Sequence, residues 1–334
     1  LCTPFTGCSF LGTLRIDTLL FFPSKQLLEV VYVMNIILIG ALELGLIYSI
    51  MALGLFVSYR MLDVADLTVD GSFTTGAAVC AVVSLTGHPL AGLMLSIPAG
   101  MAAGLVTSLL QTKMKVQPIL AGILTQMALY SINLRIMGNK SNLSLLGKES
   151  VFTLTEGWLP QSMSRLAKLP VIVLMVAVIC LLLAFFLKTK TGLSLRATGD
   201  NVEMVRSSSI DPHFTNALGL AIANGLVALS GAVLAQYQQY SDLNMGVGMV
   251  VIALASIIIG EVIVGRRNIP VHILAVVAGS ILYRLFIALA LRAASPSDLK
   301  AISAAIVALA ISYPAIKEMI AVAKLKRKGR VTHE

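Results

Sequence analysis

Long apolar segments separated by short polar ones repeat along most of the chain. Nine of these segments approach the ~20 residues that a helix needs to cross the hydrocarbon core of a bilayer. Their residues do not alternate between apolar and polar, which argues against the strands of a membrane barrel. The expected spans cover residues 35–58, 71–86, 89–111, 117–138, 170–188, 213–236, 247–264, 269–291 and 299–316. The pattern predicts an all-α polytopic membrane protein with about nine transmembrane helices.

The two ends of the chain do not share this pattern. Residues 1–33 lack the spacing of a clear span, whereas Met34 is followed at once by the apolar opening of the first predicted span. We interpret residues 1–33 as an upstream, non-native extension translated in frame. The alternative is a genuine extra segment or signal-like peptide, although its apolar run is too short for a signal core. The predicted membrane domain covers residues 34–322, and residues 323–334 form a basic tail.

Composition agrees with a membrane protein. Hydrophobic residues make up 57% of the chain and charged residues 12%, against about 25% charged residues in soluble domains. The net charge of +9 does not indicate nucleic-acid binding, because the positive side chains stand in short loops and near the C-terminus, as membrane topology requires.

Lysine and arginine recur in alternate loops between the predicted spans. The positive-inside rule places those loops in the cytoplasm, so the predicted topology has the N-terminus outside and the C-terminus inside. The basic residues in question are Arg60, Lys113, Lys115, Lys188, Lys190, Arg196, Arg206, Arg266, Arg267, Lys324, Lys326, Arg327, Lys328 and Arg330. The long external loop 139–169 is either a plain connector or a surface that binds a partner, and Trp158 and Pro160 in it suit an interfacial anchor and a turn.

Nothing in the sequence indicates an enzyme. The four histidines are scattered, and the cysteines form no cluster with spacing suited to a metal. The glycines before Lys148 are too far apart for a phosphate-binding loop. We therefore expect no cofactor, no metal and no nucleotide hydrolysis by this chain, so active transport would draw on a partner or an ion gradient.

A run of carboxylates precedes the second predicted span. Such groups are costly at hydrocarbon depth and usually face a cavity. Either Asp70 or Thr68 caps the helix that follows, or a broken helix here lines a translocation path. Polar residues inside other spans are path residues or interhelical contacts. The path candidates are Glu43, Asp63, Asp66, Thr68, Asp70, Ser72, Gln126 and Asn133.

The most unusual feature is the hydrophilic segment 191–211, which stands between two long apolar runs. We interpret it as a cytoplasmic helix on which a soluble motor docks. Gly192 permits a tight turn, Asp200 or Asn201 can cap a short helix, and Asp211 with the following proline ends the segment and begins the next span. The candidate coupling residues are Gly192, Arg196, Gly199, Asp200, Asn201, Glu203, Arg206 and Ile210.

Two motifs carry a family resemblance. Residues 66–72 resemble the Asp-Leu-Ser-Val-Gly-Ser signature of ribose-type ABC importer permeases, with Asp70 as an insertion. Residues 192–210 resemble the cytoplasmic coupling segment of branched-chain amino acid permeases, whose pattern is Gly-x-x-x-Arg-Ala, then Asn-x-Glu-Ala-Ala-Arg, then Gly-Ile. The chain departs from that pattern at Met204, Val205 and Ser209. In overall character it is closest to tryptophan/tyrosine-type uptake permeases.

The resemblance implies the transmembrane permease subunit of an ATP-driven importer in the bacterial inner membrane. It implies two cytoplasmic ATP-binding subunits, an external solute-binding protein and a second permease copy forming a homodimer. The implied solute is an aromatic or branched-chain amino acid. Three alternatives stay open: a sugar or nucleoside ABC permease, a membrane scaffold, and an ion-coupled transporter with Glu43, Asp66 and Glu261 as a relay.

Overall fold

The computed structural model describes residues 22–156, 168–265, 268–293 and 301–309, together with residues 312 and 319. Seven helices in this part of the chain are long and apolar enough to cross a membrane. The only strands among these residues are two of three residues each. The prediction of an all-α polytopic membrane protein is therefore confirmed.

The elements follow the predicted spans closely. The helices are α1 (Phe22–Leu55), α2 (Thr68–Leu85), α3 (Pro89–Thr112), α4 (Pro118–Ile136), α5 (Val151–Glu156), α6 (Lys168–Lys188), α7 (Lys190–Asp200), α8 (Val202–Ser207), α9 (Pro212–Gln238), α10 (Met249–Val264) and α11 (Ile269–Ala293). A π-helical turn, Phe56–Met61, continues α1, and the strands are β1 (Asn142–Ser144) and β2 (Tyr240–Asp242).

The helix α10 departs from the expected length. Its 16 residues rise by about 24 Å, which is less than a typical hydrocarbon core of ~30 Å. Of the ninth predicted span, 299–316, residues 301–309 are helical; apart from residue 312, the rest of it lies outside the described residues. The basic tail 323–334, residues 1–21 and the loop residues Trp158 and Pro160 also lie outside them, whereas residues 22–33 form the start of α1.

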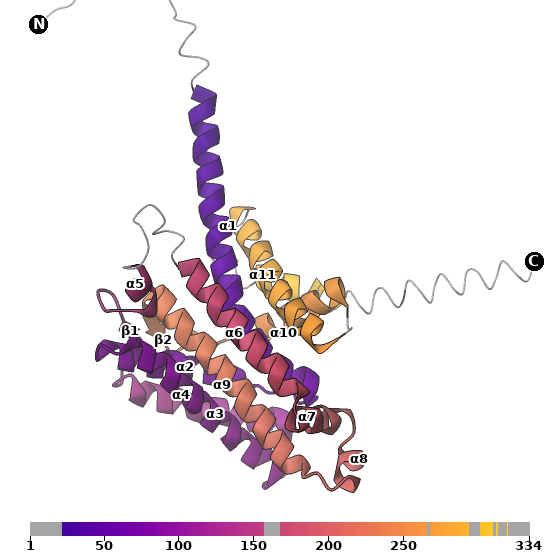
Figure 1. The fold of residues 1–334 in the computed structure, drawn as a ribbon. Helices are drawn as coiled ribbons and strands as arrows, with labels where there is room; N and C mark the ends of the chain where they lie inside the picture. The colour runs from indigo at the N-terminus through magenta and orange to yellow at the C-terminus, as the bar shows by residue number, and fades with distance from the viewer. Residues whose placement is uncertain are drawn as a thin grey trace, which may run out of the picture. The chain divides into compact units, whose positions relative to one another are not determined.

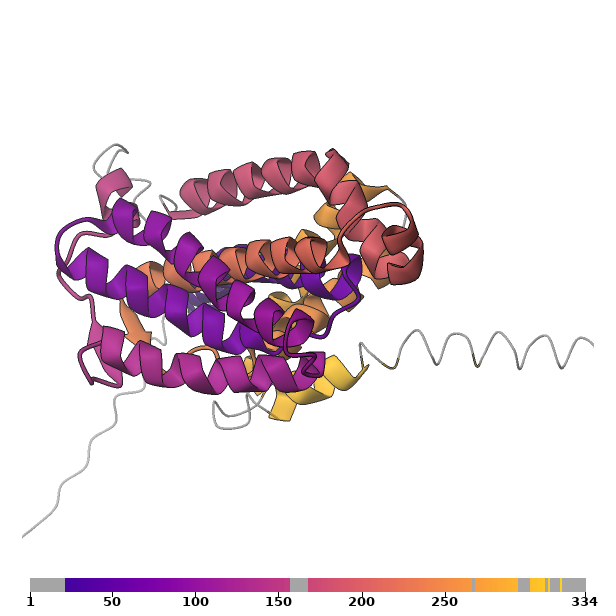
Figure 2. The same ribbon diagram turned by 90° about the horizontal axis from the view of Figure 1, so that it is seen from below.

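The chain forms two compact units, which meet in sequence between Gly40 and Ala41. The helix bundle belongs to the second unit, which begins at Ala41. Within this unit α9 runs through the middle of the bundle, with α2 and α3 on one side and α6 on the other (Figures 1 and 2). α4 packs on the outer side of α2 and keeps most of its surface exposed. A helix that is apolar on nearly all sides, as α9 is, is expected in the interior of a membrane bundle.

Glycine allows α9 to meet its neighbours at backbone distance. A Cβ at Gly100 or Gly104 of α3 would collide with the carbonyl oxygen of Asn224 or Leu220 on α9. A Cβ at Gly231 of α9 would likewise collide with the Phe73 carbonyl on α2. Lipid tails are as apolar as leucine, so helices in a bilayer associate largely through such close packing. Gly100 and Gly104 stand four residues apart and together form a packing site against α9.

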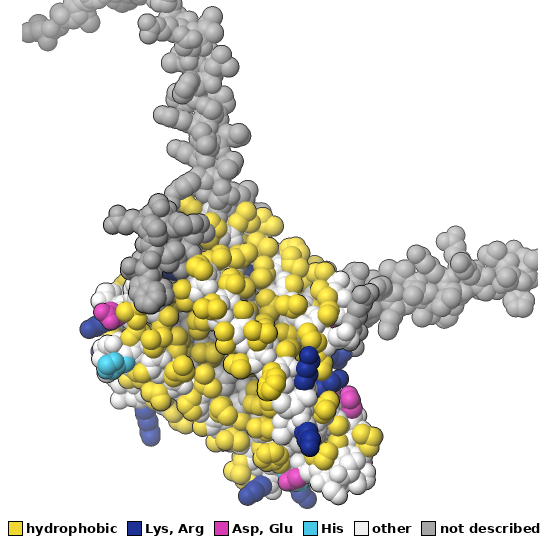
Figure 3. Space-filling view, viewed as in Figure 1, with side chains coloured by type: hydrophobic (Ala, Val, Ile, Leu, Met, Phe, Trp, Pro, Cys, Tyr) yellow, Lys and Arg dark blue, Asp and Glu magenta, His cyan; other side chains and the backbone are white. Residues whose placement is uncertain are grey.

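The two ends of the bundle differ in structure. At one end β1 and β2 form an antiparallel pair in which Leu143 opposes Ser241, and α5 lies beside them (Figure 1). Here the buried Gln236 donates its amide N–H to the Pro89 carbonyl at 2.8 Å and accepts from the Val151 backbone N–H at 3.0 Å. At the other end lie α7 and α8. On the face drawn in Figure 3, several lysine and arginine side chains gather toward that end, below a broad apolar surface.

Replacement of Gly100 by valine tests the close packing. We expect Gly100→Val to lower the free energy of unfolding by ~1–3 kcal/mol or more, because the colliding group is a backbone carbonyl that cannot rotate away. Thermal stability of the detergent-solubilised protein measures the effect. Gly40→Val is the matched control, since a Cβ at Gly40 meets nothing within 4 Å. Equal losses in both variants would contradict the packing argument.

Candidate functional site

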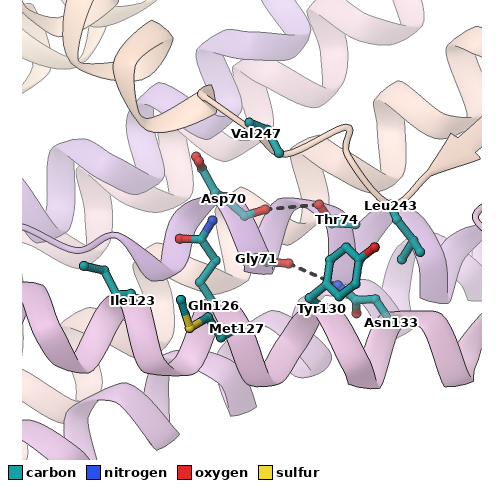
Figure 4. A pocket seen from close by; sticks show the side chains of 10 residues that line it. All are labelled: Asp70, Gly71, Thr74, Ile123, Gln126, Met127, Tyr130, Asn133, Leu243 and Val247. Carbon is teal, nitrogen blue, oxygen red and sulfur yellow. Dashed lines mark hydrogen bonds between the residues drawn. The ribbon is translucent and has the colours of Figure 1, made fainter.

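A cavity of about 260 Å³ lies between α2, α4 and the segment that precedes α10 (Figure 4). Its wall combines polar groups from α2 and α4 with apolar side chains from α4 and from the segment before α10. The ten lining residues are Asp70, Gly71, Thr74, Ile123, Gln126, Met127, Tyr130, Asn133, Leu243 and Val247. Irregular backbone at membrane depth is tolerated where it lines such a cavity, and discontinuous helices form solute sites in many transporters.

Asp70 connects two elements that are distant in the sequence. Its carboxylate oxygens accept hydrogen bonds from the backbone N–H groups of Gly248 and Val250, both at 2.9 Å. The carboxylate thus satisfies free N–H groups at the start of α10 and complements the positive end of that helix. Of the two alternatives that the sequence left open, capping of α2 by Asp70 or Thr68 is wrong. The N-cap of α2 is Leu67, which makes no side-chain capping bond.

Two further sequence candidates line the same cavity. Asn133 is 1% exposed, and its side-chain nitrogen lies 3.5 Å from the Gly71 carbonyl oxygen. Its side-chain oxygen is buried and has no hydrogen-bond partner among the described residues. Gln126 points from α4 toward Asp70 in Figure 4. Of the eight path candidates, Asp70, Gln126 and Asn133 are the ones that the structure brings to this cavity.

Three other candidates form a separate buried network beside the cavity. Asp66 accepts hydrogen bonds from the Thr68 backbone N–H at 2.8 Å and from the Asn224 amide at 2.6 Å. Ser72 donates to the oxygen of that same amide at 2.6 Å, and the hydroxyls of Thr68 and Thr107 are 2.8 Å apart. Burial raises the pKa of the Asp66 carboxyl, and the bonds from Thr68 and Asn224 oppose this rise. The network ties α2, α3 and α9 together.

The two remaining path candidates lie elsewhere. Asp63 is exposed and adopts a positive φ of 56° in the irregular segment between α1 and α2. Glu43 is buried in α1 and accepts a hydrogen bond from the Tyr237 hydroxyl at 2.8 Å. Neither residue lines the cavity.

Glu261 was a candidate relay residue in the ion-coupled alternative. In the structure it belongs to a charged cluster at the end of α1. Its carboxylate lies 3.0 Å from the Arg60 guanidinium and 2.9 Å from the His272 ring nitrogen. The His272 ring meets the Phe56 ring edge-on at 4.8 Å. These contacts join α1, α10 and α11, so they give Glu261 a structural role.

The hydrophilic segment 191–211 is two helices, and the prediction of a single continuous helix was wrong. α7 is joined to the bundle: Leu195 is fully buried, and the hydroxyls of Thr198 and Thr215 are 2.9 Å apart. A Cβ at Gly199 would collide with the Met61 carbonyl oxygen. Gly192 similarly permits close approach to Phe186, at the end of the preceding span. α7 therefore rests directly on the end of α1 and on the start of α9.

α8 is attached much less firmly. Asn201 caps it by accepting from the Met204 backbone N–H at 3.0 Å, as the sequence predicted. Glu203 and Arg206 form an exposed pair at 3.3 Å, and Met204 is 54% exposed. Asp200 is exposed, whereas Arg196 and Ile210 are half-buried. Asp211 caps α9 through the His213 N–H at 2.9 Å, which confirms the predicted start of that span.

Sequence reasoning missed Thr74 and Tyr130 of the cavity. Thr74 donates its hydroxyl hydrogen bond to the Asp70 carbonyl, an arrangement common inside helices, so its residue type gave no signal. Tyr130 stands one turn after Gln126 and about one turn before Asn133 on α4. That i, i+4, i+7 spacing places the three on one helix face and was the signal available in the sequence.

The chain resembles known proteins over most of its length. A model of the family described as "Branched-chain amino acid transport system / permease component" matches residues 37–313. A protein of Clostridioides difficile (strain R20291), described as "Tyrosine transport system permease protein", is 38% identical over 272 residues, which cover 81% of this chain and 88% of that protein. An uncharacterised protein of Rickettsia prowazekii (strain Madrid E) is 37% identical over 227 residues, 67% of this chain and 77% of that protein.

No solved structure matches the chain at a significant level. The family model and the Clostridioides relative instead agree with the two motifs found in the sequence and with the membrane helices of the structure. The chain therefore belongs to the branched-chain amino acid permease family and is the permease component of an ABC transport system.

Proposed function

We propose that the protein moves an aromatic or branched-chain amino acid into the cytoplasm, driven by ATP hydrolysis in partner subunits. The observation that carries this proposal is the 38% identity, over 88% of its length, to a protein described as a tyrosine transport permease. A mixed polar and apolar cavity between α2 and α4 supports passage of such a solute. The proposed topology has the N-terminus outside and α7 and α8 in the cytoplasm, with a solute-binding protein at the opposite end.

Contacts run without a break from the exposed segment to the cavity. Residues Gly192–Ile210 would receive the ATP-binding subunit, chiefly on α8. α7 contacts the backbone of Met61, and a short stretch of chain connects Met61 to Asp66. The side-chain amide of Asn224 forms hydrogen bonds with both Asp66 and Ser72. Since Ser72 stands on α2 beside Asp70, a rigid-body shift of α7 would reach the cavity wall.

A second copy of the permease is part of the proposal. Only 28% of the most apolar 18-residue stretch of α4 is buried within the chain. The helix also forms one wall of the cavity. Its exposed apolar side chains include Leu120, Leu124 and Met127. Packing of a second copy against α4 would place the cavity of each copy near the interface of a homodimer.

Uptake into reconstituted vesicles tests the proposed function. The chain, its ATP-binding subunits and the solute-binding protein should accumulate labelled L-tyrosine or a branched-chain amino acid only when ATP is supplied on the cytoplasmic side. Sugars and nucleosides should neither accumulate nor compete. Uptake driven by a sodium or proton gradient without ATP would contradict the proposal and favour the ion-coupled alternative.

Charge reversal on α8 tests coupling. We propose that Glu203 meets a positively charged groove of the ATP-binding subunit. Glu203→Lys should then reduce co-purification of that subunit and solute-stimulated ATP hydrolysis by tenfold or more, because like charges at an interface cost several kcal/mol. The spans should stay folded, since Glu203 is exposed and loses only the pair with Arg206, which is worth ~0.2–0.5 kcal/mol.

Glu149→Lys is the matched control for this experiment. Glu149 is also exposed, but it precedes α5 at the opposite end of the bundle (Figure 1). The control should retain the ATP-binding subunit at the level of the unmodified protein. Unchanged coupling in Glu203→Lys would mean that α8 is an ordinary solvated connection.

A further inference from the structure

The cavity between α2 and α4 contains a buried acceptor that none of the described residues uses. The Asn133 side chain is 1% exposed, and its oxygen has no hydrogen-bond partner among the described residues. The amide nitrogen lies 3.5 Å from the Gly71 carbonyl oxygen, and this contact favours the orientation in which the amide oxygen is left without a partner. A buried acceptor without a partner is unfavourable, and a hydrogen-bond donor entering the cavity would remove that cost.

The charge of the cavity favours a cation. Asp70 is the only charged residue among the ten that line it, and lysine, arginine and histidine are absent from that set. The N-terminus of α10, which would otherwise attract an anionic group, is already occupied by the Asp70 carboxylate at 2.9 Å. A carboxylate of the solute would meet repulsion there, whereas an ammonium group would meet acceptors.

The rest of the wall is suited to an apolar side chain. Ile123 and Met127 of α4 face Leu243 and Val247 of the segment before α10 across the cavity (Figure 4). Pockets for larger, drug-sized ligands are typically 300–1,000 Å³, so a volume of about 260 Å³ suits a single small solute. The part of the cavity near Asn133 and Asp70 therefore offers hydrogen-bond acceptors, and the rest of its wall is apolar.

We propose that this cavity is a solute-binding subsite within the permease itself, which recognises the ammonium group of an amino acid through Asn133 and Asp70. The apolar residues Met127, Leu243 and Val247 take up the side chain of that amino acid. The inference rests on the proposed import of amino acids and extends it. Part of the selectivity then belongs to this chain, and it does not depend on the solute-binding protein.

Direct binding without the solute-binding protein tests the subsite. The complex of this chain with its ATP-binding subunits, in lipid nanodiscs, should bind labelled L-tyrosine saturably. Tyramine, which keeps the ammonium and lacks the carboxylate, should compete. 3-(4-Hydroxyphenyl)propionate, which keeps the carboxylate and lacks the ammonium, should not compete. This comparison needs no substitution and so does not depend on the folding of a variant.

Substitution of Asn133 supplies the second measurement. Asn133→Leu keeps a similar volume and removes the acceptor, so L-tyrosine should bind about tenfold more weakly or worse, as expected for a lost hydrogen bond to a charged group. Asn133→Asp keeps an acceptor and should retain binding. Asn216→Leu is the matched control, because the Asn216 oxygen is also buried and unpartnered in the described structure but lies outside this cavity. It should bind L-tyrosine like the unmodified protein.

The results separate this inference from the proposed function. Competition by the propionate but not by tyramine would overturn the subsite, as would unchanged affinity in Asn133→Leu. Absence of saturable binding by a complex that still imports L-tyrosine with ATP would overturn the subsite and leave the import proposal standing. Failure of ATP-driven amino acid import in the complete system would overturn the proposed function instead.

Discussion

Backbone-to-backbone contact between α9 and its neighbours α2 and α3 underlies the rest of the structure. Within a bilayer the hydrophobic effect does not favour one helix pairing over another, so close approach has to supply the attraction. Glycine at positions 100, 104 and 231 removes the side chains that would hold these helices apart. The same approach brings the Asn224 side chain of α9 between Asp66 and Ser72. The buried polar network thus depends on the glycine contacts, and in turn it fixes how α2 lies on α9.

The position of α2 determines where α10 begins. The first N–H groups of a helix have no acceptor within that helix. Asp70 supplies the missing acceptors from a different helix. The contact stabilises both partners, because the N–H groups of Gly248 and Val250 also stabilise the half-buried Asp70 carboxylate. The segment before α10 is held as the third wall of the cavity as a consequence.

The structure also relates the hydrophilic segment 191–211 to this region in physical terms. α7 is packed against the end of α1 and the start of α9, whereas α8 carries exposed charged and apolar side chains. α8 is thus suited to binding a partner, and α7 is suited to transmitting a displacement of that partner to the bundle. Rigid elements in direct contact transmit a shift without needing flexible links. The charged cluster around Glu261 reinforces the same end of the bundle by joining α1, α10 and α11.

The sequence by itself determined the class of protein, most of the span boundaries, the hydrophilic segment and the caps at Asn201 and Asp211. These features follow from local composition and from hydrogen bonds between residues two or three positions apart, which the order of residues largely dictates. Only the tertiary structure decided that Asp70 caps α10, and that the Asn133 side chain lines a cavity with an acceptor that no described residue uses. Both depend on partners that are distant along the chain, which helix packing brings together. Because a carboxylate or amide inside a span is equally compatible with capping, interhelical bonding or lining a cavity, its residue type alone cannot distinguish among them.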